Sequence, residues 1–131
     1  MLRHGIINAQ LDEALARLRH KDRFVISDSG LPVQPGIEVI DLALVYGVPR
    51  FEQVLDALSP ELVLECGWMA IEAQGTKAQQ WVTDRFDVPI TYVPHDGPLG
   101  FKAQVEGAKF VIRTGETTPY ANVIFRCGVP F

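Results

Sequence analysis

The chain has 131 residues, a net charge of −4 at pH 7 and 47% hydrophobic residues, which fits one globular domain over residues 1–131. Its Lys and Arg residues form no basic run that could follow the phosphates of a nucleic acid. No stretch approaches the ~20 apolar residues that span a bilayer, and the first residues lead to a polar helix rather than to an apolar signal core. We therefore expect neither a nucleic acid nor a membrane as partner.

Hydrophobic periodicity predicts helices and strands that alternate along most of the chain. Asn8 can cap the first helix, and Pro49 suits the start of the second. The predicted helices are 9–19, 50–58, 75–86 and 101–107, and the predicted strands are 24–27, 37–44, 62–66 (extended or bent by 68–71), 88–93, 109–113 and 120–126. The last two strands follow each other directly, which favours an α/β fold, a mixed β-sheet covered by helices with a mixed edge.

The stretch 18–32 carries the first candidate site. His20 lies where the first helix should end, and Asp28 lies where the next strand runs out into a Ser-Gly turn. Histidine exchanges a proton near neutral pH, and a nearby carboxylate can fix its tautomer. If the strand packs back against the helix, the two side chains form a proton-transfer pair. The alternative is structural, with a histidine that caps the helix and an aspartate that forms a turn.

The other histidines and the serines indicate no second kind of chemistry. His4, His20 and His95 lack metal-ligand spacing, so we expect no metal. Ser27 and Ser29 do not lie in a Gly-x-Ser-x-Gly elbow, which argues against a serine hydrolase. His95 follows a predicted strand on a loop at the sheet edge, either as a site residue or as an exposed loop histidine.

The most densely polar segment of the chain lies between Arg113 and Asn122. We expect Tyr120 and Asn122 on one face of the last strand and Ala121 on the other, because residues two apart point the same way. A phenol and a carboxamide suit a ligand covered with hydroxyl groups. The alternative is a plain hairpin connection in which Arg113 and Glu116 form an ion pair.

The two cysteines and the apolar residues 129–131 bear on assembly. Cys66 and Cys127 lie in apolar strand-like segments and are expected to be reduced, buried thiols, because sequence alone gives no geometry for a disulfide. The segment Val129-Pro130-Phe131 is expected to pack on the body of the chain or on a neighbouring subunit.

Several short motifs occur together along nearly the whole chain. They are Asn8 with Leu11, then His20, Ser27–Pro32, Ile40–Leu44, Gly47–Pro49, Ile112–Glu116, Pro119–Asn122 and Cys127–Phe131. In this order and spacing they resemble the D-ribose pyranase family. The related L-fucose mutarotases share the His, the Asp and the Tyr-x-Asn pattern but lack the Gly-Leu-Pro and Gly-Val-Pro motifs of this chain.

The resemblance implies an enzyme that interconverts the pyranose and furanose forms of ribose, and its anomers, without a cofactor. It implies His20 as the proton donor. It also implies substrate contacts from Asp28, from His95 and from the segment of Tyr120, Ala121 and Asn122. A cytoplasmic, ring-shaped oligomer is implied as well, a homopentamer or a homodecamer of stacked rings, with sites between adjacent subunits.

Two departures from the family pattern stand close to these residues. Arg19 occupies the position before His20 where the family usually has Gly, and the spacing from His95 to Arg113 is a few residues longer, through 96–100. Two other functions stay open. The protein could be a mutarotase for fucose or another sugar, or it could bind a sugar without turnover.

Overall fold

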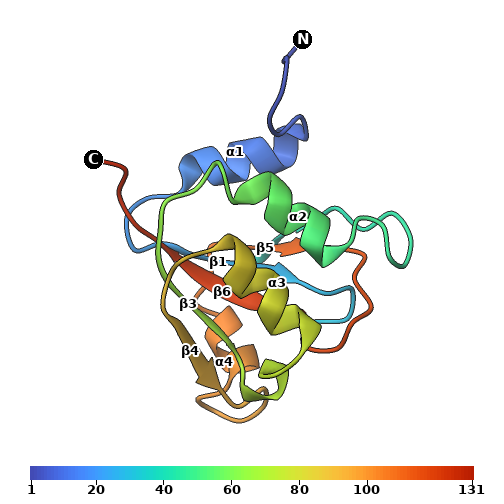
Figure 1. Ribbon diagram of the computed structural model, residues 1–131, viewed down its shortest axis with the longest axis vertical. Helices are drawn as coiled ribbons and strands as arrows, with labels where there is room; N and C mark the ends of the chain where they lie inside the picture. Colours follow the sequence, from blue (N-terminus) through green and yellow to red (C-terminus); the bar gives the residue numbers. More distant parts are fainter.

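The buried strand β1 (Arg23–Ser27) lies at the centre of the sheet in the computed structural model, which describes residues 1–131 (Figure 1). Its residues Phe24 to Ser27 are all fully buried, as suits a strand covered on both faces. The strand order is β2-β5-β1-β6-β3-β4. The other strands are β2 (Glu38–Asp41), β3 (Leu64–Ala70), β4 (Ile90–Val93), β5 (Phe110–Arg113) and β6 (Val123–Cys127).

The antiparallel strand of the sheet is central. β6 runs antiparallel to both β1 and β3, whereas the pairs β2–β5, β5–β1 and β3–β4 are parallel. The mixed sheet and the α/β class are therefore confirmed, but the predicted mixed edge is wrong. The last two strands are consecutive in sequence, yet β1 lies between them in the sheet.

The helices begin and end close to their predicted limits. They are α1 (Ala9–Arg17), α2 (Phe51–Leu58), α3 (Lys77–Arg85) and α4 (Phe101–Val105), with a short 3₁₀ helix, η1 (Ile71–Ala73), that was not predicted. Asn8 caps α1 as expected, because its Oδ1 accepts the Leu11 amide at 2.9 Å. None of the helices combines the length and apolar character needed to cross a bilayer.

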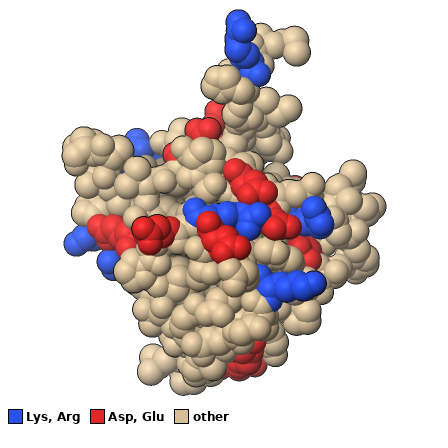
Figure 2. Space-filling view, in the orientation of Figure 1, with Lys and Arg blue, Asp and Glu red and all other residues tan.

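Helices cover the two faces of the sheet unequally. α1, α2 and α3 pack on one face, against a core that includes Phe24, Ile26 and Phe125. The short helix α4 lies on the other face, where Val25 and Ile124 contribute to a smaller core (Figure 1). This division follows from the alternation of side chains along β1 and β6. Acidic and basic side chains are interspersed over the helical face, without a basic patch (Figure 2).

The structure tests the predictions made for the two cysteines and for the apolar segment 129–131. Both cysteines are free, as predicted, but only Cys127 is buried, and the predicted burial of Cys66 is wrong because this residue of β3 is half-buried. Burial raises the pKa of the Cys127 thiol to about 11, with smaller contributions from the Asp22 and Glu65 carboxylates. Phe131 is 100% exposed, so its own chain does not cover it. The alternative, that a second copy covers this segment, stays a prediction.

Replacing Phe125 with Ala should lower the free energy of unfolding by about 3–5 kcal/mol, because it empties a fully buried ring position. The ring lies 4.6 Å from Phe86 and 6.0 Å from Phe24, centroid to centroid, so neither neighbour can fill the space without moving. Urea denaturation measures the loss. The exposed control Leu99→Ala should change stability by about 0.5 kcal/mol or less, and an equal loss in both variants would contradict this packing.

Candidate functional site

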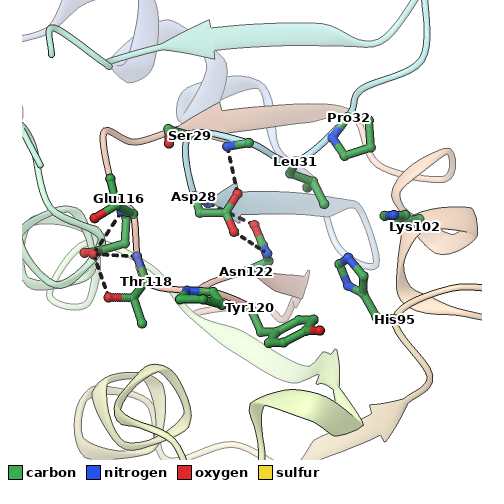
Figure 3. Close-up of a pocket in the computed structure, with 13 residues that line it drawn as sticks. Asp28, Ser29, Leu31, Pro32, His95, Lys102, Glu116, Thr118, Tyr120 and Asn122 are labelled. Atoms are coloured by element: carbon green, nitrogen blue, oxygen red, sulfur yellow. Dashed lines mark hydrogen bonds between the residues drawn. The ribbon is translucent and has the colours of Figure 1, made fainter. Parts of the chain in front are cut away.

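A polar cavity of about 340 Å³ opens where β1 ends (Figure 3). The segment after β1, the turn before β6 and the loop before α4 enclose it. Its lining residues are Asp28, Ser29, Gly30, Leu31, Pro32, His95, Lys102, Glu116, Thr117, Thr118, Pro119, Tyr120 and Asn122. The predicted site residues Asp28, His95, Tyr120 and Asn122 are thus brought together, whereas His20 is not among them.

Asp28 and Asn122 hold each other in place at the floor of the cavity. The Asn122 side-chain amide donates to Asp28 Oδ2 at 3.0 Å, and the Asp28 backbone amide donates to Asn122 Oδ1 at 2.9 Å. The Gly30 amide donates to the other carboxylate oxygen of Asp28 at 2.9 Å. Asn122 is 3% exposed, so this pairing satisfies a buried amide and fixes the orientation of the carboxylate.

The turn before β6 presents Tyr120 and Asn122 to the cavity. Tyr120 has a φ of 61°, and β6 begins only at Val123, so the prediction that alternation along a strand aligns the two side chains is wrong. A tight turn performs this task instead, with the Asn122 amide donating to the Tyr120 carbonyl at 2.8 Å. Ala121 is fully buried and does not line the cavity.

His95 lies at the opposite wall, on the loop between β4 and α4. Its ring meets that of Tyr120 edge to face with 5.1 Å between centroids and lies 6.3 Å from that of Phe101. Its backbone amide donates to the Glu72 carboxylate at 3.1 Å, which ties the loop to η1. The Nδ1 atom is buried and has no hydrogen-bond partner. His95 is therefore a half-buried wall of the cavity rather than a freely exposed loop residue.

Glu116 is a buried carboxylate that sequence reasoning did not select. Burial raises its pKa, but hydrogen bonds from the amides of Phe51, Thr117 and Thr118 and from the Thr118 hydroxyl outweigh burial and hold the pKa below the ordinary value. The Phe51 amide is the first of α2, where a carboxylate is also favoured by the helix dipole. The alternative interpretation, a hairpin connection with an Arg113–Glu116 ion pair, is wrong, because Arg113 pairs with Asp41 at 2.9 Å.

His20 lies at the other end of β1 from the cavity. The five residues of β1 alone span roughly 16 Å at about 3.3 Å per residue, so the expected His20–Asp28 pair does not form within one chain. The partner of His20 is Glu65 on β3, with 2.5 Å between Nε2 and Oε1. The His20 hydrogen bond is the largest cause that lowers the Glu65 pKa, and the Arg126 guanidinium, 2.8 Å from Oε2, also lowers it.

Sequence reasoning missed Glu65, Lys102 and Glu116. Glu65 carried a signal, because a carboxylate interrupts the apolar run of a predicted strand. Glu116 lies in the densely polar segment 113–122, but it was considered there only as a possible ion-pair partner of Arg113. Lys102 carried no signal, because its position at the cavity depends on how α4 packs near distant segments. No three His, Cys, Asp or Glu side chains cluster as metal ligands in the structure.

Comparisons with known proteins agree over the full length. The sequence model of the RbsD / FucU transport protein family matches residues 1–130. The D-ribose pyranases of Cutibacterium acnes and Corynebacterium glutamicum are each 47% identical to this chain over 100% of both sequences. Bacillus subtilis RbsD, solved in complex with D-ribose, has a TM-score of 0.91 at 40% identity over 100% of both chains. The Streptococcus pneumoniae fucose mutarotase, solved with L-fucose, shares the fold, with a TM-score of 0.79 at 22% identity over 99% of this chain and 100% of that one.

Replacing Glu116 with Gln should lower the free energy of unfolding by about 1.5–3 kcal/mol at neutral pH, because the amide nitrogen cannot accept the surrounding N–H groups. A carboxylate whose folded pKa lies below the ordinary 4.5 stabilises the fold fully above that pH, and its contribution disappears as the pH falls through the lowered pKa. Denaturation of both proteins from neutral to acid pH should therefore show a shrinking difference. A difference that stays constant into acid would contradict this role, and the exposed Asp87→Asn serves as control.

Proposed function

This chain belongs to the RbsD/FucU family, and we propose that it is a D-ribose pyranase, an isomerase that interconverts the pyranose and furanose forms of D-ribose and its anomers. The main support is the combination of 47% identity to D-ribose pyranases over the full length with the polar cavity at Asp28 and Asn122. The Bacillus subtilis structure, which contains D-ribose, supports the same class of ligand.

The cavity suits a small polyhydroxylated ligand. A volume of about 340 Å³ lies at the lower end of the ~300–1,000 Å³ typical of ligand sites. Asp28 accepts hydrogen bonds, Asn122 and Tyr120 combine donors and acceptors, and the Tyr120 ring offers a flat apolar surface to a sugar. Glu116 Oε2 already accepts three hydrogen bonds and Oε1 one, whereas each oxygen of the Asp28 carboxylate accepts one, so Asp28 has more free capacity to bind a hydroxyl.

The proton donor in this proposal is His20 of a second copy. Within one chain His20 is remote from the cavity. A head-to-tail contact between two copies would place the His20 end of β1 in one copy against the cavity end of β1 in the next. Such heterologous contacts form a ring when the rotation between successive copies closes on itself. From the family resemblance, the proposal includes a ring-shaped homopentamer, or a homodecamer of two rings, in the cytoplasm. The exposed Phe131, which lines a surface hollow together with His20, would then be covered by the neighbour.

The chemistry needs one acid and one acceptor. Ring opening protonates the ring oxygen, breaks its bond to the anomeric carbon and removes the proton of the anomeric hydroxyl, which leaves an aldehyde. Because Glu65 holds Nε2 of His20, Nδ1 is the atom free to donate to the ring oxygen. We assign Asp28 as acceptor of the anomeric proton. Reclosure through a different hydroxyl reverses these transfers and gives the other ring form.

Exchange NMR on D-ribose tests the proposed function. An enzyme transfers saturation between pyranose and furanose signals at catalytic concentration, whereas a sugar-binding protein shifts lines without faster exchange. A panel that includes L-fucose distinguishes a ribose enzyme from a fucose enzyme. Faster exchange of L-fucose but not of D-ribose would overturn the assignment of substrate.

Replacing His20 with Gln should abolish the accelerated exchange, because a positioned acid contributes ~10²–10⁴-fold and glutamine cannot supply the proton. His4→Gln is the matched control, since His4 is an exposed histidine outside the cavity and the Glu65 contact. Saturation transfer on D-ribose measures both variants. Wild-type exchange by His20→Gln would remove His20 from the mechanism.

Mixing two inactive variants, His20→Ala and Asn122→Ala, should restore activity after dissociation and reassembly. In a head-to-tail ring each site takes His20 from one copy and Asn122 from the next, so random mixing leaves about one quarter of the sites intact. Exchange NMR measures the recovery, and light scattering confirms reassembly. Reassembled rings without recovered activity would contradict a site that takes His20 from one copy and Asn122 from the next.

A further inference from the structure

The contact between His20 and Glu65 continues into a chain of side chains across β1, β6 and β3, which lie side by side in the sheet (Figure 1). Arg126 on β6 donates its Nε to Glu65 Oε2 at 2.8 Å, and its guanidinium carbon lies 5.9 Å from the centre of the Trp68 ring on β3. We propose that Arg126 is a positioning residue, which holds Glu65 and, through Glu65, orients the His20 ring. The inference rests on the proposed function for the role of His20 as proton donor.

An irregularity in β3 directs Glu65 toward His20. Leu64 and Cys66 pair with consecutive residues of β6, so Glu65 between them is an extra residue in the ladder. Such a bulge re-aims a side chain and is frequent next to active sites. The amide of the residue that follows His20 donates to the Cys127 carbonyl on β6 at 3.0 Å. The backbone at His20 and the carboxylate that it contacts are therefore both fixed relative to β6.

The neighbours of Arg126 favour its orientation toward Glu65. Arg23 on β1 lies directly opposite Arg126 in the antiparallel pair, and like charges in that arrangement repel. The Arg23 guanidinium lies over the Trp68 ring, 4.2 Å from its centre, which is a favourable cation–π distance. Arg126 instead pairs with the Glu65 carboxylate. Repulsion from Arg23 and attraction to Glu65 thus act in the same direction.

Arg126 limits the freedom of the carboxylate that His20 contacts. One oxygen of Glu65 meets His20 Nε2 and the other meets Arg126 Nε, so the carboxylate cannot rotate without losing a partner. The His20 hydrogen bond is the largest cause that lowers the Glu65 pKa, and the Arg126 charge adds to it against the effect of burial, so Glu65 is an anion in the neutral range. A fixed anion at Nε2 keeps the proton of the neutral ring on that atom, and Nδ1 is left to serve the sugar.

Five variants test the action of Arg126 through Glu65: Arg126→Gln, Arg126→Lys, Glu65→Gln, the double variant Glu65→Gln with Arg126→Gln, and Arg17→Gln as control. Arg17 is a matched arginine, because its guanidinium lies 3.0 Å from the Glu38 carboxylate and it does not line the cavity. Urea denaturation checks that each variant is folded.

The first measurement is the ¹⁵N chemical shifts of the ring nitrogens of neutral His20, which report which nitrogen carries the proton. His4 is exposed and gives the shifts of an unrestrained ring in the same spectrum. This measurement needs neither sugar nor turnover. A wild-type protein without exchange activity would therefore refute the proposed function and leave this test intact.

The wild type and Arg17→Gln should show the His20 proton fixed on Nε2. Arg126→Gln should move the His20 shifts toward those of His4, and Glu65→Gln should move them further. Arg126→Lys should restore them in part, because an ammonium supplies the charge but not the guanidinium geometry. His20 shifts in Arg126→Gln that equal those of the wild type would overturn the positioning role.

The second measurement separates kcat from KM by exchange NMR at several D-ribose concentrations. Arg126→Gln should lower kcat about two- to fivefold, the scale of one exposed ion pair, and leave KM unchanged, because Arg126 does not line the cavity. The double variant should be no slower than Glu65→Gln alone. Multiplicative losses of kcat in the double variant, or an Arg126→Gln effect on KM without one on kcat, would overturn the action of Arg126 through Glu65.

Discussion

The reciprocal hydrogen bonds between Asp28 and Asn122 are the constraint on which the site depends. They join the residue after β1 to the residue before β6, two neighbouring strands that run in opposite directions. Ninety-four positions of sequence separate the two residues, so the contact requires that β1 and β6 pair. The floor of the polar cavity therefore depends on pairing at the centre of the sheet, and the fold itself orients the Asp28 carboxylate that lines the cavity.

Much of the fold could be predicted from local patterns, but the strand order could not. Apolar spacing identified the four α-helices and six strands, and Asn8 marked the start of α1 correctly. The predicted strand 37–44 shrinks to Glu38–Asp41, because the chain leaves the sheet once the pairing with β5 ends. The central position of β6 depends on pairing with both β1 and β3, which lie about 100 and 60 residues earlier, and no local pattern encodes such pairing.

The sequence predicted which types of residue form the site better than it predicted how they are arranged. Asp28, Tyr120 and Asn122 do line one cavity, but a turn with positive φ at Tyr120 aligns the last two, not strand alternation. His20 has the carboxylate partner that its chemistry requires, yet that partner is Glu65, because β1 separates His20 from Asp28. His20 and Asp28 are close in sequence, but they lie far apart in space because β1 runs between them. The same separation makes a second copy part of the proposed enzyme.

A crystal structure of the protein with D-ribose would show directly which copy supplies each side chain of the site. We expect the sugar in the cavity of Asp28 and Asn122, with Nδ1 of His20 from a neighbouring copy within hydrogen-bond distance of the ring oxygen or the anomeric oxygen. A sugar bound beside His20 of its own chain, or a sugar in this cavity with no His20 from any copy within reach, would contradict it.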